Sequence, residues 1–121
     1  MAQPSGRVHV HLVVSEMKRS IDFYTTVLGF FYDHGIREMA WLTREGLLLT
    51  LAPGEADPRR GQYFGWSLAS IQELMEHYES LHARHLRVSA PPEPDGSRLF
   101  FFLYDPDDYA ICFSYQPMDY V

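Results

Sequence analysis

The order of predicted elements in the first half of this 121-residue chain returns in the second half, and this repeat constrains the fold more than any other feature. The first half opens with residues 7–14, which are rich in β-branched residues and predict a strand. Ser15 is a favourable N-cap for a helix. Four apolar residues follow it at helical spacing: Met17, Ile21, Tyr24 and Leu28. Gly29 then stands where a helix-ending glycine belongs.

Three short strands are predicted over residues 30–52. Gly35 and the turn at residues 44–46 separate them. Residues 53–61 follow, with two prolines, two glycines and four charged side chains. This composition is typical of a connecting loop, so the first block ends there.

The same order then starts again. Residues 62–68 predict a strand, and Ser70 with Glu73 matches the capping box that begins a helix. The helix has an apolar stripe made of Ile71, Leu74, Met75, Tyr78 and Leu81. Three more strands are predicted after it, over residues 86–90, 98–104 and 109–116, with a loop at 91–97.

Two such blocks predict a single α+β domain built from paired βαβββ modules. Module one covers about residues 7–52, the linker 53–61, and module two about 62–116. One module covers one face of its sheet with the helix and leaves the other face open. Two modules side by side would give a curved sheet that encloses a cavity, with the helices outside.

Composition and charge narrow the class of protein. The formal net charge of −6 repels phosphate backbones, so nucleic acid is not expected as a partner, whereas a cationic ligand would be attracted. The apolar runs are too short to span a bilayer, so no membrane partner is expected either. A single cysteine, Cys112, is compatible with the reducing cytoplasm. We therefore expect a soluble cytoplasmic protein.

Strand alternation sorts side chains between the helix side and the cavity side. Val8, Val10, Leu12 and Val14 form an apolar row that is predicted to meet the helix. The residues between them, with the matching positions of three other strands, are predicted to face the cavity. From this set we take as candidate ligand-binding residues His9, His11, Thr50, Tyr63, Ser67, Cys112 and Ser114.

Two segments resemble a known family. Residues 10–30, VHLVVSEMKRSIDFYTTVLGF, are similar to the opening strand and helix of vicinal oxygen chelate proteins, the superfamily of glyoxalases, bleomycin resistance proteins and extradiol dioxygenases. Residues 103–113, LYDPDDYAICF, are similar to the family's last turn and strand, with Asp108 where glycine is usual. The resemblance implies the same paired-module fold and a homodimer with a small-molecule cavity.

The resemblance also implies where a divalent metal would be held in metal-using members. Carried over one by one, the four ligand positions fall on His9, Thr50, Tyr63 and Cys112. Only His9 has the usual chemistry, with His11 and Cys112 as weak candidates to complete a site for Zn, Fe, Mn or Ni. The sequence therefore predicts that the family's metal site is lost and that no cofactor is needed.

Other interpretations of these side chains stay open. His9 and His11 are either polar, hydrogen-bonded residues that line the cavity or a base with its partner. Cys112 is interpreted as a small buried residue in preference to a nucleophile. Phe100, Phe101, Phe102 and Tyr104 are assigned to the core and a subunit interface. His77, His82 and His85 are expected on a solvated helix face.

Three functions follow in order of preference. The first is a non-catalytic protein that binds a small, cationic aromatic molecule, as the bleomycin-resistance branch does. The alternative is a metal-dependent lyase, isomerase or ring-cleaving dioxygenase. The second alternative is a metal-free enzyme that uses cavity histidine, tyrosine or cysteine for proton transfer.

Overall fold

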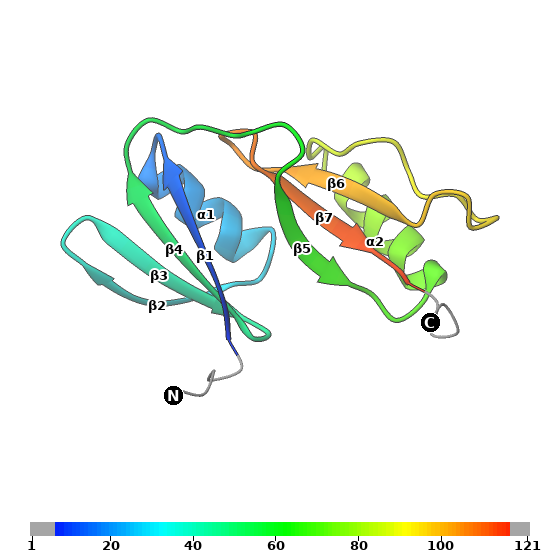
Figure 1. Ribbon diagram of the computed structural model, residues 1–121, viewed down its shortest axis with the longest axis horizontal. Coiled ribbons are helices and arrows are strands. Elements are labelled where there is room, and N and C mark those ends of the chain that lie inside the picture. The colour runs from blue at the N-terminus through cyan, green and yellow to red at the C-terminus, as the bar shows by residue number, and fades with distance from the viewer. Residues whose placement is uncertain (1–6, 117–121) are drawn as a thin grey trace. The chain divides into compact units, whose positions relative to one another are not determined.

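The structure, a computed structural model, describes residues 7–116. Contacts divide the chain between Asp57 and Pro58 into two compact units, coloured blue to green and green to red in Figure 1. The division falls within the predicted linker. The sequence predicts that the two units form a single domain, and this stays a prediction.

The first unit is a four-stranded sheet with one helix. Its elements are β1 (Val8–Val14), α1 (Met17–Thr26), β2 (Phe31–Ile36), β3 (Met39–Arg44) and β4 (Leu47–Pro53). The sheet order is β1-β4-β3-β2, in which β1 and β4 are parallel and the other pairs antiparallel. The helix α1 covers one face of this sheet (Figure 1).

The core of this unit lies between α1 and the sheet. Tyr24 on the helix is fully buried and meets Phe30 edge-on, with ring centroids 5.7 Å apart. Leu12 and Val14 of β1 are buried as predicted, but Val8 is 65% exposed. The apolar row on β1 therefore meets the core only at the C-terminal end of the strand. Leu42, Leu49 and Leu51 complete the core from β3 and β4.

The N-cap of α1 is Glu16 and not Ser15, so that prediction was wrong. The chain stays extended through Glu16 (φ −139°), and the Ser15 hydroxyl accepts a hydrogen bond from the Arg19 guanidinium instead (2.9 Å). Arg19 also forms an ion pair with Glu16. The helix end was predicted correctly, because Gly29 has φ +70° and begins the return of the chain to β2.

Gly35 does not separate two strands, as the sequence had suggested. It lies inside β2 and pairs with Ala40, and the turn comes later, at Arg37, which has φ +58°. A side chain at position 35 would meet the Tyr32 hydroxyl and the Met39 carbonyl oxygen. The glycine therefore allows Tyr32 to lie over the backbone of its own strand.

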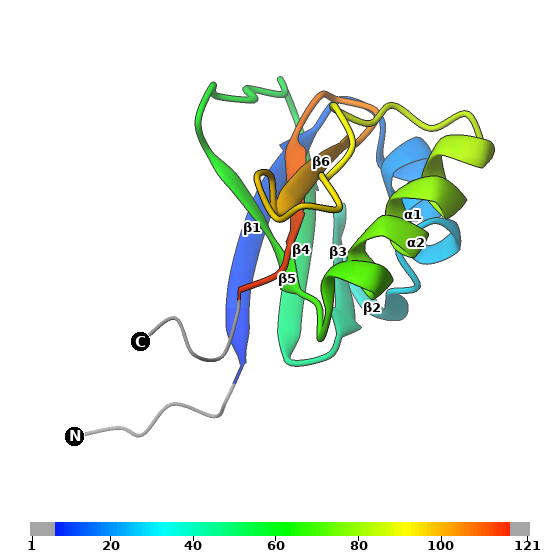
Figure 2. The same ribbon diagram turned by 90° about the vertical axis from the view of Figure 1, so that its right-hand side faces the viewer.

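The second unit has a three-stranded sheet and one helix. Its elements are β5 (Tyr63–Ser67), α2 (Ile71–Ala83), β6 (Phe100–Tyr104) and β7 (Ala110–Ser114). The sheet order is β5-β7-β6, with β5 parallel and β6 antiparallel to β7. Figures 1 and 2 show α2 along one face of this sheet.

The contact between α2 and its sheet is largely aromatic. Tyr78 meets Phe101 edge-on at 5.3 Å, and His77 meets Phe113 edge-on at 4.4 Å between ring centroids. His77 is half-buried, so its assignment to a solvated helix face was wrong, while His82 and His85 are exposed as expected. The N-cap is present as predicted, because Ser70 Oγ accepts from the Glu73 N–H (3.1 Å), while Glu73 Oε2 accepts from the N–H of Ala69 (3.1 Å), one residue before the N-cap.

The strand predicted at residues 86–90 is reduced to one isolated bridge between Val88 and Leu103. The Ser89 N–H donates to the Phe102 carbonyl (2.9 Å), but the Phe102 N–H donates to the Ser89 hydroxyl (2.8 Å) and not to a backbone carbonyl. Pro91 follows and cannot donate to a ladder. The second module is therefore βαββ in the described residues, with a short paired segment where its third strand was expected.

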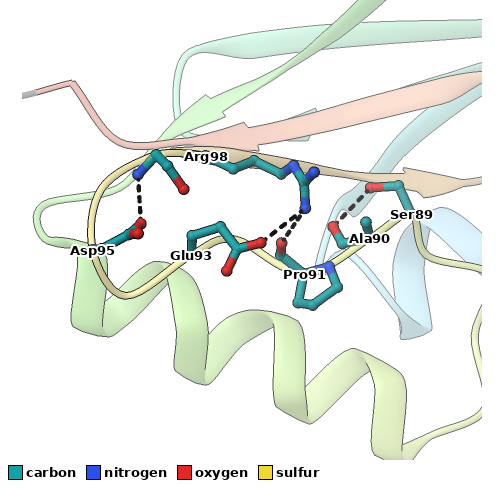
Figure 3. Close-up of polar contacts among 7 residues, drawn as sticks. Ser89, Ala90, Pro91, Glu93, Asp95 and Arg98 are labelled. Carbon is teal, nitrogen blue, oxygen red and sulfur yellow. Dashed lines mark hydrogen bonds and ion pairs between the residues drawn. The ribbon is translucent and has the colours of Figure 1, made fainter.

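The loop after this segment is held by its own polar contacts (Figure 3). Arg98 donates to the Pro91 carbonyl (3.1 Å) and to the Glu93 carboxylate (3.4 Å). Asp95 Oδ1 accepts from the Ser97 N–H at 2.9 Å. Hydrogen bonds from Ser97 lower the pKa of the Asp95 carboxyl, because they favour its charged form.

Within residues 7–116, neither helix is long and apolar enough to cross a membrane.

Candidate functional site

The sheet of the second unit has one face against α2 and one face open. Ile111 and Phe113 on β7 are buried on the α2 side. Because side chains alternate along a strand, Ala110, Cys112 and Ser114 take the other side. This is the face on which the sequence analysis had placed Cys112 and Ser114.

A hollow of about 760 Å³ lies on this open face, and we call it the aromatic hollow. Tyr63 of β5 and Phe102 of β6 meet edge-on there, with ring centroids 5.3 Å apart. Tyr63 is 60% exposed and Phe100 is 43% exposed, so their rings are available to a ligand. The hollow is lined by residues that include Tyr63, Ser67, Phe100, Phe102, Cys112 and Ser114.

The polar groups of the aromatic hollow are uncharged. The hydroxyls of Ser67 and Ser114 lie 3.5 Å apart, because the two residues are paired in the parallel ladder of β5 and β7. None of the described residues that line the hollow is a carboxylate, lysine or arginine. Rings with a few hydroxyls suit an aromatic ligand whose orientation is fixed by one or two hydrogen bonds.

Cys112 is buried at the floor of this hollow. Burial raises the pKa of its thiol, because the charged thiolate loses its hydration there. A neutral thiol is a poor metal ligand and a poor nucleophile. The interpretation of Cys112 as a small buried residue is therefore favoured over a reactive one.

A second cluster lies in the first unit, on the face of the sheet away from α1. The Thr50 hydroxyl lies 2.7 Å from His11 Nδ1 and 3.2 Å from His9 Nε2. His11 and Thr50 are opposite each other in the parallel ladder of β1 and β4, and Trp41 is opposite Thr50 on β3. Thr50 is 2% exposed, whereas both histidines are exposed, so the imidazoles cover the hydroxyl.

The sequence matches a family model over residues 6–113, described as the Glyoxalase/Bleomycin resistance protein/Dioxygenase superfamily. The chain belongs to this superfamily. The match covers most of the chain and both segments that carried the resemblance. No curated protein matches the sequence closely enough to add to this assignment.

Solved structures of the glyoxalase superfamily share the fold. The fosfomycin resistance protein FosX from Listeria monocytogenes superposes with a TM-score of 0.79 at 17% identity, covering 98% of each chain. A glyoxalase/bleomycin resistance protein/dioxygenase from Nocardioides gives 0.75 at 21% identity, covering 98% of this chain and 87% of that one. Lactoylglutathione lyase from Agrobacterium tumefaciens gives 0.72 at 16% identity, covering 94% and 96%. At these identities the likeness shows the fold alone.

Members of this superfamily that use a divalent metal need several anionic or imidazole donors at one point. Among residues 7–116, no group of three or more His, Cys, Asp or Glu side chains could hold a metal ion. At the predicted positions, Thr50 offers a neutral hydroxyl that is already bonded to two imidazoles, and Cys112 offers a thiol that holds its proton. These donors do not fit a divalent metal.

Sequence reasoning did not include Phe102 among the candidate site residues, because the aromatic run at 100–104 had been assigned to the core and an interface. Phe101 is in the core, but Phe102 is opposite Cys112 and lines the aromatic hollow with it. Trp41 was not included either. Both follow from strand register, which pairs them with Cys112 and Thr50, and the register depends on contacts that are distant in sequence.

Proposed function

We propose that this member of the glyoxalase superfamily binds a small, cationic aromatic molecule in the aromatic hollow and does so without a metal. The observation that carries the proposal is the open, uncharged hollow, which is lined by the exposed rings of Tyr63 and Phe100 and the half-buried ring of Phe102. Aromatic faces attract cations, and each such contact contributes about 0.5 to 2 kcal/mol. The net charge of −6 would also draw a cation toward the protein.

We also propose a cytoplasmic homodimer. Three large apolar side chains of β2 are exposed: Phe31 at 77%, Tyr32 at 52% and Ile36 at 54%. Such side chains commonly mark a contact surface. Light scattering coupled to size exclusion would give twice the chain mass for a dimer, and the mass of one chain would contradict it.

The proposed function is tested by binding of a fluorescent cationic probe, (naphthylmethyl)trimethylammonium, to the wild type and to Tyr63→Ala. Removal of the exposed ring should weaken binding about fivefold to tenfold, since each tenfold is about 1.4 kcal/mol. The control is Val8→Ala, which shortens a similarly exposed apolar side chain of the first unit (65%, against 60% for Tyr63) outside the proposed contact surface on β2. Equal affinities for Tyr63→Ala and Val8→Ala would contradict the assignment of the hollow.

Proton transfer without a metal is a second candidate, and the cluster of His9, Thr50 and His11 favours it. A hydroxyl donates one hydrogen bond and accepts up to two. An O–H donor makes the shorter bond, so Thr50 is assigned as donor to His11 Nδ1 at 2.7 Å and as acceptor from His9 Nε2 at 3.2 Å. The Nδ1 lone pair of His9 is therefore not used in the contact with Thr50. A general base needs such a lone pair to accept a proton.

The second candidate is tested with 5-nitrobenzisoxazole, whose ring opens when a base removes its carbon-bound proton and the N–O bond breaks to a coloured phenolate. If His9 acts as a base, the wild type should open the ring at least tenfold faster than His9→Ala, which is a modest share of ordinary general-base catalysis. His82→Ala is the control, because His82 is exposed on α2. Equal rates in the wild type and both variants would rule out this candidate.

A further inference from the structure

A second hollow adjoins the aromatic hollow on the same face of the second sheet. Its volume is about 580 Å³, and Tyr63 and Phe102 line both hollows. Arg59, Arg60, Tyr104 and Asp108 also line the second hollow. A single ligand lying on the shared rings would therefore reach both hollows.

Arg60 is held at this place by a tight turn. The Gln62 N–H donates to the Arg59 carbonyl (3.1 Å), and Gly61 between them has φ +86°. A type II turn requires a positive φ at its third residue, and this puts Arg60 at the second. The turn leads directly into β5, so the backbone of Arg60 is fixed close to Tyr63, the first residue of that strand.

Arg60 makes no hydrogen bond or ion pair with the rest of residues 7–116. The only acidic side chain that lines this hollow, among the described residues, is Asp108. Arg87 donates to the Asp108 carboxylate and lies 5.4 Å from the centre of the Tyr104 ring. Since the acidic group is already compensated, Arg60 gives this hollow a positive charge in a chain that is acidic as a whole.

We propose that the second hollow binds a carboxylate on the same ligand whose aromatic part lies in the aromatic hollow. Guanidinium groups match the geometry of a carboxylate and bind it through two parallel hydrogen bonds. The ligand class is then an amphoteric aromatic compound, cationic near the rings and anionic at Arg60. This inference rests on the proposed function, because it needs the aromatic part of the ligand to lie on Tyr63 and Phe102.

Three matched probes separate the groups: 3-(2-naphthyl)alanine, its amide, which lacks the carboxylate, and 3-(2-naphthyl)propionate, which lacks the amine. Affinities would be measured by isothermal titration at low salt for the wild type, Arg60→Gln, Arg60→Lys and Arg37→Gln. Arg37→Gln is the control, because it removes the same charge from the hairpin turn of the first unit. All four proteins would be checked for folding by circular dichroism.

In the wild type, naphthylalanine should bind about fivefold tighter than its amide, as expected for a partly exposed charge pair. Arg60→Gln should bring that ratio to about one without changing the affinity of the amide, Arg60→Lys should keep part of it, and Arg37→Gln should leave it unchanged. A ratio of one in the wild type, or an equal loss in Arg37→Gln, would overturn the inference and leave the aromatic site in place. Failure of all three probes to bind would overturn the proposed function together with the inference.

Discussion

Cys112 has a pKa raised above its ordinary value of 9.0 because the thiol is buried beneath the aromatic hollow. A thiol with a raised pKa holds its proton more tightly in the folded than in the unfolded chain. The stability that this contributes is therefore complete below the unfolded pKa and is lost as the pH rises through the folded one. It is the only cysteine, so alkylation reports on it alone.

We predict that the alkylation rate of folded protein by iodoacetamide keeps rising with pH beyond the midpoint of an ordinary thiol, because only the thiolate reacts. The same chain in concentrated urea should show the ordinary midpoint, about 8.5 to 9. A folded-state rate that levels off below this midpoint would instead indicate an activated cysteine, and would revive Cys112 as a nucleophile.

Gly65 is required by the close approach of β5 to β7. It pairs with Cys112, and a Cβ atom at position 65 would collide with the Cys112 carbonyl oxygen and lie 2.8 Å from its backbone nitrogen. Gly65→Ala should therefore lower the free energy of unfolding by about 2 to 3 kcal/mol, as overpacking against backbone does. Urea denaturation would measure the loss. Ser67→Ala, two residues on in the same strand, should cost less than about 1 kcal/mol, and equal losses would contradict the steric account.

At the scale of the element, α2 begins at a cap that the sequence predicted. Ser70→Ala removes the acceptor of the Glu73 N–H and should cost about 1 kcal/mol of stability. Ser80→Ala, on an exposed position of α2 far from the cap, should instead stabilise the chain by a few tenths of a kcal/mol, because alanine has the higher helix propensity. The two variants would be compared by urea denaturation, where a change of the same sign in both would contradict the capping role of Ser70.

Elements with a local signal could be predicted from the sequence, and elements fixed by distant contacts could not. The cap and the apolar stripe of α2 are each made by residues a few positions apart in sequence. The glycine that ends α1 likewise lies close in sequence to its own helix. Gly35 is an exception: it was read as a break, although Tyr32, whose hydroxyl leaves no room for a side chain at position 35, lies only three residues before it. Residues 86–90 alternate like a strand, but the Ser89 hydroxyl replaces a ladder partner.

The candidate site follows the same division. Strand alternation predicted that Tyr63, Ser67, Cys112 and Ser114 share a face, and all four line the aromatic hollow. It also predicted one face for His9, His11 and Thr50, which are joined by hydrogen bonds. Alternation could not predict that Phe102 lies opposite Cys112 or that a turn holds Arg60. Both depend on how strands and loops pair. The roles of these residues as binding residues stay predictions.

For the molecule as a whole, we predict from the donors present that it holds no divalent metal tightly. After dialysis against Zn, Fe, Mn or Ni salts and removal of free metal, elemental analysis of the untagged protein should find well under one equivalent bound. The reason is that Thr50, Tyr63 and Cys112 replace the donors that a divalent ion needs. One tightly held equivalent that disappears in His9→Ala would contradict this and favour a metal-dependent lyase, isomerase or dioxygenase.

The aromatic hollow as the ligand site is tested most directly by a two-dimensional ¹H–¹⁵N NMR titration with (naphthylmethyl)trimethylammonium. The account predicts saturable shifts concentrated at Tyr63, Phe102, Cys112 and Ser114, with His9, His11 and Thr50 changing little. Shifts centred on the histidine cluster, or weak shifts spread over the surface without saturation, would contradict it.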